Sequence, residues 1–377
     1  MIDVKDKKKC TGCHACMSVC PRKCIQMMPD EEGFLYPQVD KEQCIGCGAC
    51  EKVCPVLHPS DRQFPLQVYA ARNWDEDVRM SSSSGGVFTL LASEIIRRGG
   101  IVFGASFAKD WQVVHSWTEQ MEGLAAFQGA KYVQSLMGDT YLQVCRFLKQ
   151  GRWVLFSGTP CQVAGLKHFL RTSYERLLTV DVVCHGVPSP LVWRTYLDSI
   201  NPCNAPITAL SMRDKSRGWK QYGMEIRTED TVLYTGKAAM NLYSQGYLDN
   251  LYLRPSCYAC PVRKGRSHSD LTLGDFWGIE RVYPSMDDNR GTGLVLVNTP
   301  MGMNFYRSLL VLQKEVTYEQ ALCGNPSLEC SAPLTEVREE FWRRFPAEGM
   351  KVVSDIHQRK RKIWVRLLNR IYKMIGT

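Results

Sequence analysis

Residues 10–21, CTGCHACMSVCP, decide the fold of the N-terminal part of this chain, and residues 44–55, CIGCGACEKVCP, repeat their pattern. Each stretch contains three cysteines with two residues between neighbours. Three further residues then separate the third cysteine from a Cys-Pro pair. The second stretch starts 34 residues after the first, and glycine, alanine and valine recur at the same offsets in both. The sequence therefore contains an internal duplication whose two halves are expected to fold as one unit.

This cysteine spacing is that of bacterial ferredoxins, which hold two [4Fe–4S] clusters. Three closely spaced thiolates reach one cubane from a tight loop, and the fourth ligand of each cubane comes from the other half of the repeat. Zinc ribbons are the alternative, but zinc sites use pairs of Cys-x2-Cys rather than three cysteines followed by Cys-Pro. We assign one cluster to Cys10, Cys13, Cys16 and Cys54 and the other to Cys20, Cys44, Cys47 and Cys50.

Beyond the repeat, strand-like and helix-like segments alternate along the chain. Strand-like apolar runs lie at 68–72, 101–104, 154–156 and 178–183, and helical segments at 88–98, 138–149 and 191–200. This alternation predicts an α/β body with a mixed or parallel sheet. We expect an α+β protein with a ferredoxin-type domain at 1–58, a linker at 59–67, the body at 68–325 and a basic C-terminal helical tail at 326–377.

Four further cysteines lie in the body at positions that suggest a common site. Cys161 and Cys184 follow the carboxyl ends of two predicted strands, where open α/β sheets place their ligands. Cys257 and Cys260 form a Cys-x2-Cys-Pro loop. Four thiolates suffice for a third [4Fe–4S] cluster. The alternatives are a zinc site or, for Cys161 and Cys184, buried thiols.

A run of serine and glycine at residues 81–87 precedes the predicted helix at 88–98. Small residues with free N–H groups before a helix N-terminus form anion sites, which would suit the pyrophosphate of a flavin or a nucleotide. The alternative is a flexible connector.

Several segments, in order along the chain, resemble the beta subunit of coenzyme F420 hydrogenase/dehydrogenase, an enzyme family that uses a deazaflavin hydride carrier. They are Ser82–Val87, Gly129–Val133, Gly158–Gln162, Val183–Pro188, Cys257–Cys260 and Ser269–Gly278. The resemblance implies that the body binds FAD, with its phosphates near Ser82, Ser83, Ser84, Gly85, Gly86 and Val87. It also implies a [4Fe–4S] cluster beside the flavin, held by Cys161, Cys184, Cys257 and Cys260.

The resemblance also places Lys131 and Tyr132 beside the flavin, and three side chains near the expected cofactors are candidates for catalysis. Lys131 would stabilise an anionic reduced flavin, because a nearby cation lowers the cost of that charge; the alternative is a surface lysine. His185 is suited either to proton transfer or to a supporting hydrogen bond near the cluster. Asp275, predicted in a glycine-flanked turn, would bind cofactor or cap that turn.

The net charge of +9 is concentrated near the C-terminus, where residues 359–373 carry seven positive charges and no acid. The charge is therefore not a general nucleic-acid signature. From about residue 357 the pattern predicts an amphipathic helix, which would lie on an anionic membrane, dock on a partner or pack on the body. Its apolar side consists of Trp364, Leu368, Ile371 and Ile375. A second basic stretch, with Arg213 and Lys215 beside Trp219, is expected to be a solvated loop; the alternative is a binding surface for an acidic substrate or cofactor tail.

No apolar run approaches the ~20 residues of a membrane span, and residues 1–9 lack the apolar core of a signal peptide. We therefore expect a cytoplasmic protein, with peripheral contact at the inner membrane surface through the tail. The resemblance implies an FAD-dependent iron–sulfur oxidoreductase that passes electrons between [4Fe–4S] clusters and FAD, and reduces or oxidises an organic substrate or the deazaflavin. Its partner would be a soluble electron donor or acceptor of the ferredoxin or reduced deazaflavin type, and no nucleic acid. The alternative is an electron-transfer subunit that lacks its own substrate and docks on a partner enzyme.

Overall fold

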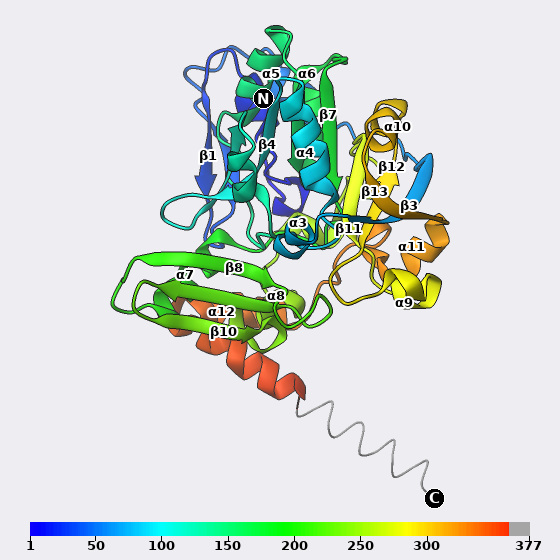
Figure 1. Ribbon diagram of the computed structural model, residues 1–377. Coiled ribbons are helices and arrows are strands. Elements are labelled where there is room, and N and C mark those ends of the chain that lie inside the picture. Colours follow the sequence, from blue (N-terminus) through cyan, green and yellow to red (C-terminus); the bar gives the residue numbers. More distant parts are fainter. Residues whose placement is uncertain (362–377) are drawn as a thin grey trace, which may run out of the picture.

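An eight-stranded mixed sheet lies at the centre of the computed structural model, which describes residues 1–361 (Figure 1). Its strands are β3 (Gln67–Asn73), β4 (Ile101–Phe107), β5 (Val113–Thr118), β6 (Val154–Gly158), β7 (Leu177–Val182), β11 (Leu271–Asp275), β12 (Gly293–Val297) and β13 (Val311–Val316). They are ordered β13-β3-β12-β11-β7-β6-β4-β5. The middle strands β11, β7, β6 and β4 are parallel, and the pairs outside them are antiparallel. The predicted α+β architecture with a mixed sheet is confirmed.

Helices cover both faces of this sheet, which explains why its middle strands are continuous apolar runs. Along β6, Leu155 joins the apolar cluster under α4 (Val87–Arg97) and α10 (Pro300–Arg307). Its neighbours Val154 and Phe156 join the cluster under α5 (Thr140–Lys149) and α6 (Pro160–Leu170). Successive strand side chains point to opposite faces, so each strand residue is committed to one of the two cores.

The N-terminal domain repeats its backbone as well as its cysteines. Two short helices, α1 (Ala15–Val19) and α2 (Ala49–Lys52), follow the two cysteine loops, and β1 (Ile25–Pro29) pairs antiparallel with β2 (Leu35–Val39). His14 and Gly48 hold equivalent positions before the helices with φ of 65° and 70°. The two halves thus share one loop conformation, as expected of an internal duplication.

This domain packs directly on the central body. Cys13, Ala15 and Val53 belong to the same apolar cluster as the side chains of α5 and α6. Gly165 in α6 makes the close approach possible, because a Cβ there would lie 2.9 Å from Cys13 Cβ and 3.0 Å from Cys13 Sγ. The first cysteine loop therefore lies against α6 with no side chain between them.

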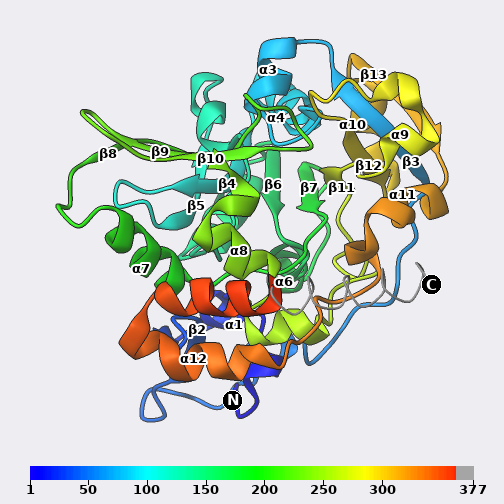
Figure 2. The same cartoon turned by 90° about the horizontal axis from the view of Figure 1, so that it is seen from below.

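A second layer lies below the central sheet in Figure 1. It contains the antiparallel strands β8 (Ile207–Asp214), β9 (Gly223–Thr228) and β10 (Val232–Lys237), which the sequence patterns did not predict. The helices α7 (Pro190–Ile200), α8 (Leu242–Leu248) and α12 (Val337–Glu348) pack against it (Figure 2). The remaining helices are α3 (Glu76–Ser81), α9 (Ile279–Val282) and α11 (Tyr318–Gly324).

Residues 351–361 are helical and continue the packing of α12 on this layer. Lys360 Nζ lies 2.9 Å from Asp249 Oδ1, and Arg359 Nη2 lies 2.5 Å from Glu340 Oε2. The apolar side predicted for the tail, Trp364, Leu368, Ile371 and Ile375, lies outside the described residues. In the described part of the chain, no helix has both the length and the apolar character needed to cross a membrane.

Candidate functional site

The cysteines of the N-terminal domain gather around two small cavities. Cys10, Cys13, Cys16 and Cys54 line one of them. Cys20, Cys44, Cys47 and Cys50 line the other, together with Cys24. In each cavity one of the four predicted ligand cysteines comes from the opposite half of the repeat. We call these two groups the inner set, which lies against α6, and the outer set, in which Cys47 is exposed.

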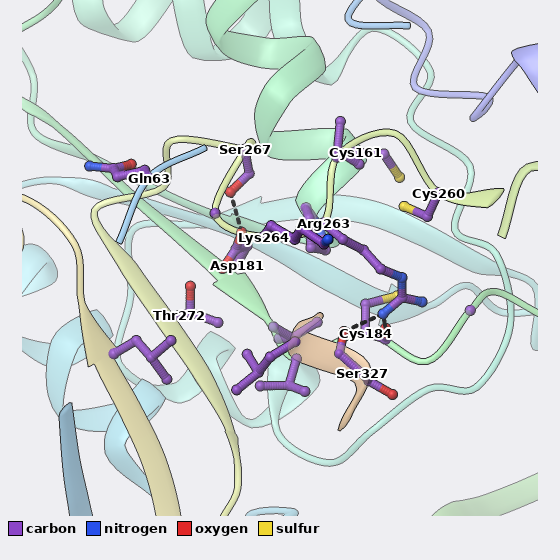
Figure 3. Close-up of a pocket in the computed structure, with 18 of the residues that line it drawn as sticks. Gln63, Cys161, Asp181, Cys184, Cys260, Arg263, Lys264, Ser267, Thr272 and Ser327 are labelled. Carbon is purple, nitrogen blue, oxygen red and sulfur yellow. Dashed lines mark hydrogen bonds between the residues drawn. The ribbon is translucent and has the colours of Figure 1, made fainter. Parts of the chain in front are cut away.

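The four body cysteines line a third cavity, of about 60 Å³. Cys161 stands in the first turn of α6, and Cys184 follows β7. Cys257 lies within the short helix η4 (Pro255–Ala259), and Cys260 directly follows it. Figure 3 shows Cys161 and Cys260 pointing toward each other, with Cys184 beside Arg263. Parallel strands bring their carboxyl ends to one sheet edge, which explains why Cys161 and Cys184 meet.

The chemistry of these thiols fits a cluster better than a single ion. Within residues 1–361 no three His, Cys, Asp or Glu side chains are arranged to hold one metal ion. A zinc site needs its ligands about 2.3 Å from one point, whereas a cubane is held by thiolates spread around it. Burial raises the pKa of Cys184 to about 12 and that of Cys257 to about 11, and neighbouring thiols add to both shifts. These thiols would ionise together only around a cationic group.

Two side chains of this cavity were not predicted as site residues from the sequence. Arg263 Nη1 donates to the carbonyl of Cys184 at 2.8 Å, and its Nη2 donates to the carbonyl of His185 at 2.9 Å. Asp181, the penultimate residue of β7, accepts a hydrogen bond from Ser267 at 2.5 Å (Figure 3). Neither residue stands in a recognisable motif, so only the fold reveals that they face the cysteines.

A larger cavity, of about 350 Å³, lies on the other side of Cys184. It is lined by every residue predicted to touch the flavin or to act in catalysis: Ser82, Ser83, Ser84, Gly85, Gly86, Val87, Lys131, Tyr132, His185 and Asp275. Cys184, Gly186 and Val187 line both cavities. The structure therefore brings segments far apart in the sequence to one place, with a cysteine in the shared wall.

The Ser/Gly run leads into the N-terminus of α4 at the edge of this cavity. Gly86 caps the helix with φ of 78°, and no side chain within residues 1–361 caps its first N–H groups. Gly85 must be glycine because a Cβ would lie 2.2 Å from the Ala71 carbonyl oxygen. Lys215 Nζ donates to the carbonyls of Ser84 at 3.0 Å and Arg290 at 2.8 Å. The loop is thus fixed in place and is not a flexible connector.

The basic stretch around Trp219 is not a solvated loop, contrary to the expectation from the sequence. Arg213 and Lys215 are buried, and Arg213 lines the larger cavity. Arg213 Nη1 lies 2.8 Å from Asp275 Oδ2 and donates to Tyr132 Oη at 2.9 Å. Arg213 turns inward because Asp275 and the Tyr132 phenol pair with its Nη1, and Lys215 turns inward because backbone carbonyls accept from its Nζ. Spacing along the sequence does not reveal these distant partners.

Asp275 is the last residue of β11. The prediction that it lies in a glycine-flanked turn is therefore wrong. Besides Arg213, it accepts a hydrogen bond from Trp219 Nε1 at 2.8 Å. The indole of Trp219 stacks on Trp277 at 4.8 Å. Both Asp275 oxygens are therefore engaged by protein groups, an arrangement suited to positioning Arg213 and Trp219.

Lys131 and His185 are partly buried in the cavity wall. Lys131 Nζ donates to the carbonyls of Gln128 at 3.1 Å and Gly129 at 3.2 Å, and burial lowers its pKa to about 8. His185 Nε2 lies 2.6 Å from Asn250 Oδ1, so the imidazole donates to the amide oxygen. Burial lowers the pKa of His185. Lys131 can thus supply positive charge to the cavity, and His185 is held as a neutral ring.

A buried network not predicted from the sequence supports Cys161. Gln162 Nε2 donates to Ser135 Oγ at 2.8 Å, which leaves the serine hydroxyl to donate to His115 Nδ1 at 2.9 Å. His115 Nε2 then donates to the Ser157 carbonyl at 3.0 Å. Burial lowers the pKa of His115 to about 4, which keeps it in this neutral form. The network fixes the start of α6 relative to the larger cavity.

Residues 151–320 match the family model that describes the C-terminal part of the coenzyme F420 hydrogenase/dehydrogenase beta subunit. Residues 9–57 match the model of a 4Fe-4S dicluster domain. The matched family region, residues 151–320, contains Cys161, Cys184, Cys257 and Cys260, and the resemblance predicted from the sequence is confirmed.

Among solved structures, the F420-reducing [NiFe] hydrogenase complex from Methanosarcina barkeri, studied by xenon derivatization, is similar to this chain with 15% sequence identity. The match covers 79% of this chain and 92% of that chain, with a TM-score of 0.46. A search of curated proteins gave no match. The family region and the ferredoxin-type domain together identify an iron–sulfur protein related to the beta subunit of F420 hydrogenase.

Proposed function

We propose that this chain is an iron–sulfur flavoprotein oxidoreductase, in which electrons pass between the ferredoxin-type domain and an FAD in the larger cavity. The observation that carries the proposal is the position of Cys184 in the wall shared by the two body cavities. A cluster on Cys161, Cys184, Cys257 and Cys260 would lie directly against a flavin in that cavity. FAD supplies the exchange between two-electron hydride chemistry and one-electron transfer.

The cavity offers the polar groups that a flavin dinucleotide requires. The uncapped N–H groups at the start of α4 form a site for a diphosphate, because a helix N-terminus favours anions. Lys131 and Arg213 contribute positive charge to the same cavity. Positive charge near the ring of a reduced flavin lowers the cost of its negative charge.

Electrons would reach this cavity through α6. The inner set contacts α6 at Gly165, which lies one turn after Cys161, or about 6 Å along the helix axis. The inner set would therefore be the donor to the body cluster, and the outer set, with its exposed Cys47, would meet the external donor or acceptor. The hydride partner is proposed to be the deazaflavin coenzyme or another organic hydride acceptor, on the basis of the family.

The proposal is tested by FAD uptake during anaerobic reconstitution of the full chain. Ser83 lines the cavity and is partly exposed, so its side chain is replaceable without disturbing the core. Ser83→Glu places a carboxylate at the proposed diphosphate site and should lower FAD affinity at least tenfold. The neutral variant Ser83→Gln is the control for size and should retain most of the affinity.

Iron content should be the same in both variants, because neither touches a cysteine. An unsubstituted chain that binds no FAD would refute the proposal, as would equal affinities for the Glu and Gln variants. A chain that binds FAD and turns over only with a second protein would favour the electron-transfer subunit instead.

A further inference from the structure

Arg254 lies between the inner set and the loop that carries Cys257. Its side chain is only 1% exposed. Nε donates to the Cys10 carbonyl at 2.7 Å, and Nη2 donates to the Leu35 carbonyl at 2.9 Å. Nη2 also lies 3.5 Å from Cys10 Sγ, within hydrogen-bonding reach of sulfur. One guanidinium therefore contacts both the backbone and the thiol of an inner-set cysteine.

The charge of Arg254 has no acidic partner among the residues that the structure describes. In residues 1–361 no Asp or Glu forms an ion pair with it, and the remaining donor, Nη1, is bonded to the neutral Gln134 Oε1 at 3.0 Å. The guanidinium also lies over the Tyr36 ring, 4.3 Å from its centroid. A buried cation without a counter-ion is strongly disfavoured. An anionic group is therefore expected at the inner set.

A cubane with four thiolates supplies that negative charge. Reduction adds one more negative charge to the cluster, so a fixed cation beside a ligand sulfur stabilises the reduced form more than the oxidised form. A hydrogen bond to the sulfur acts in the same direction. The described hydrogen bonds to the outer-set sulfurs come from neutral groups, since Ile2 N–H donates to Cys50 Sγ at 3.3 Å and Cys24 Sγ lies 3.4 Å from Cys20 Sγ. The cation near this set, the Met1 ammonium, differs from Arg254 because it is exposed and paired with Glu51 Oε2 at 2.8 Å.

We propose that Arg254 is the buried counter-ion of the inner cluster and raises its reduction potential, which draws electrons from the outer cluster toward the body. In this step one electron leaves the outer cluster and enters the inner one, and no bond is made or broken. Arg254 acts on the cluster through its fixed positive charge and is not a catalytic residue, because it contacts the proposed cluster ligand Cys10 and no substrate. The inference rests on the proposed assignment of Cys10, Cys13, Cys16 and Cys54 to one cluster.

The test is a redox titration of the reconstituted full chain, followed by electron paramagnetic resonance. In Arg254→Gln, the midpoint of one ferredoxin-domain cluster should move to a more negative potential while the other stays in place. Arg254→Lys keeps the charge and should move the midpoint less. The control is Arg281→Gln, because the Arg281 side chain is 84% exposed and its described ion pair is with Glu280. Unchanged midpoints in Arg254→Gln with full iron content would overturn the proposal.

A second variant neutralises the charge without removing the arginine. Gln134→Glu places a carboxylate against Nη1 in nearly the same shape, and it should also lower the midpoint of the inner cluster. If Arg254→Gln fails to assemble a cluster, an unchanged midpoint in Gln134→Glu overturns the proposal. Too little iron in the unsubstituted chain for two ferredoxin-domain clusters would instead refute the cluster assignment.

Discussion

At the scale of single residues, the site depends on side chains that are fixed by close contacts or by buried hydrogen bonds. Gly165 is the clearest case, because the missing side chain is what lets the first cysteine loop lie against α6. His115 is another, because its neutral ring links Ser135 to the Ser157 carbonyl in a buried network. Each residue makes one structural link that a measurement can isolate.

Gly165→Ala should disturb the inner set. The new methyl group would overlap Cys13 and the Tyr141 hydroxyl, at 2.8 to 3.0 Å, and overpacking of this kind costs about 1–3 kcal/mol. We expect a lower thermal midpoint and slower electron transfer from the ferredoxin-type domain to the body, measured by stopped-flow absorbance. Gly236→Ala is the control, since its nearest contact is the end of the Tyr234 side chain at 3.2 Å. Equal effects of the two substitutions would contradict this account of Gly165.

His115 should make stability depend on pH between about 6.5 and 4. Its folded pKa of about 4 lies below the ordinary 6.5 because of burial, so the unfolded chain binds the proton first as the pH falls. Stability is therefore lost through that window, by up to about 3 kcal/mol. His115→Gln should flatten the pH dependence of the thermal midpoint, whereas the exposed His58→Gln should not. An unaltered pH profile in His115→Gln would show that the ring is not held neutral.

At the scale of elements, helix α6 joins the two parts of the proposed electron path. Its N-terminus is fixed by a capping box, in which Thr159 N donates to Gln162 Oε1 at 2.8 Å. The Thr159 hydroxyl also lies 3.1 Å from Cys161 Sγ. The same residues thus set the start of the helix and the position of a cysteine of the proposed cluster.

Thr159→Ala should therefore have two effects. Loss of a cap costs about 1 kcal/mol, and we expect the body cluster to be lost more readily on exposure to air. Thr317→Ala removes the equivalent cap of α11, which carries none of the twelve proposed ligand cysteines, and should lower stability by a similar amount without affecting iron retention. The measurement is thermal unfolding together with iron content over time. Similar iron loss in both variants would contradict a specific role for Thr159.

The elements also show how far a sequence predicts this molecule. The strands at β3, β4, β6 and β7 and the helices α4, α5 and α7 were predicted within a few residues, because each is a long apolar or amphipathic run. The layer of β8, β9 and β10 was not predicted, because its exposed, irregular strands have a weak period. The inward orientation of Arg213 and Lys215 depends on distant partners, which no local pattern contains.

At the scale of the whole molecule, the ferredoxin-type domain is attached to both layers of the body. Arg338 of α12 lies 2.5 Å from Glu32, and both side chains are about one-eighth exposed. Burial raises the pKa of Glu32 despite this partner, so the pair is costly to separate. Ser189 adds a hydrogen bond to the Glu32 carbonyl. The domain is therefore held in one orientation toward the proposed electron path.

Breaking this ion pair should loosen the domain. Arg338→Ala leaves Glu32 buried without a partner, and we expect a loss of about 3 kcal/mol. Limited proteolysis should then cleave faster within 59–67, the predicted linker. The double variant Arg338→Ala with Glu32→Gln removes the unpaired charge and should recover part of the stability. A double variant less stable than the single one would contradict this view of the contact.

The central claim is that one chain carries electrons from ferredoxin-type clusters to a flavin through a third cluster. The most direct measurement is the iron and flavin content of the full chain, purified and reconstituted without oxygen. The account predicts about twelve irons, four for each cubane, with one FAD. It also predicts about eight irons when Cys184 and Cys257 are both replaced by serine. About eight irons and no flavin in the unsubstituted chain would contradict the claim and leave only the ferredoxin-type domain.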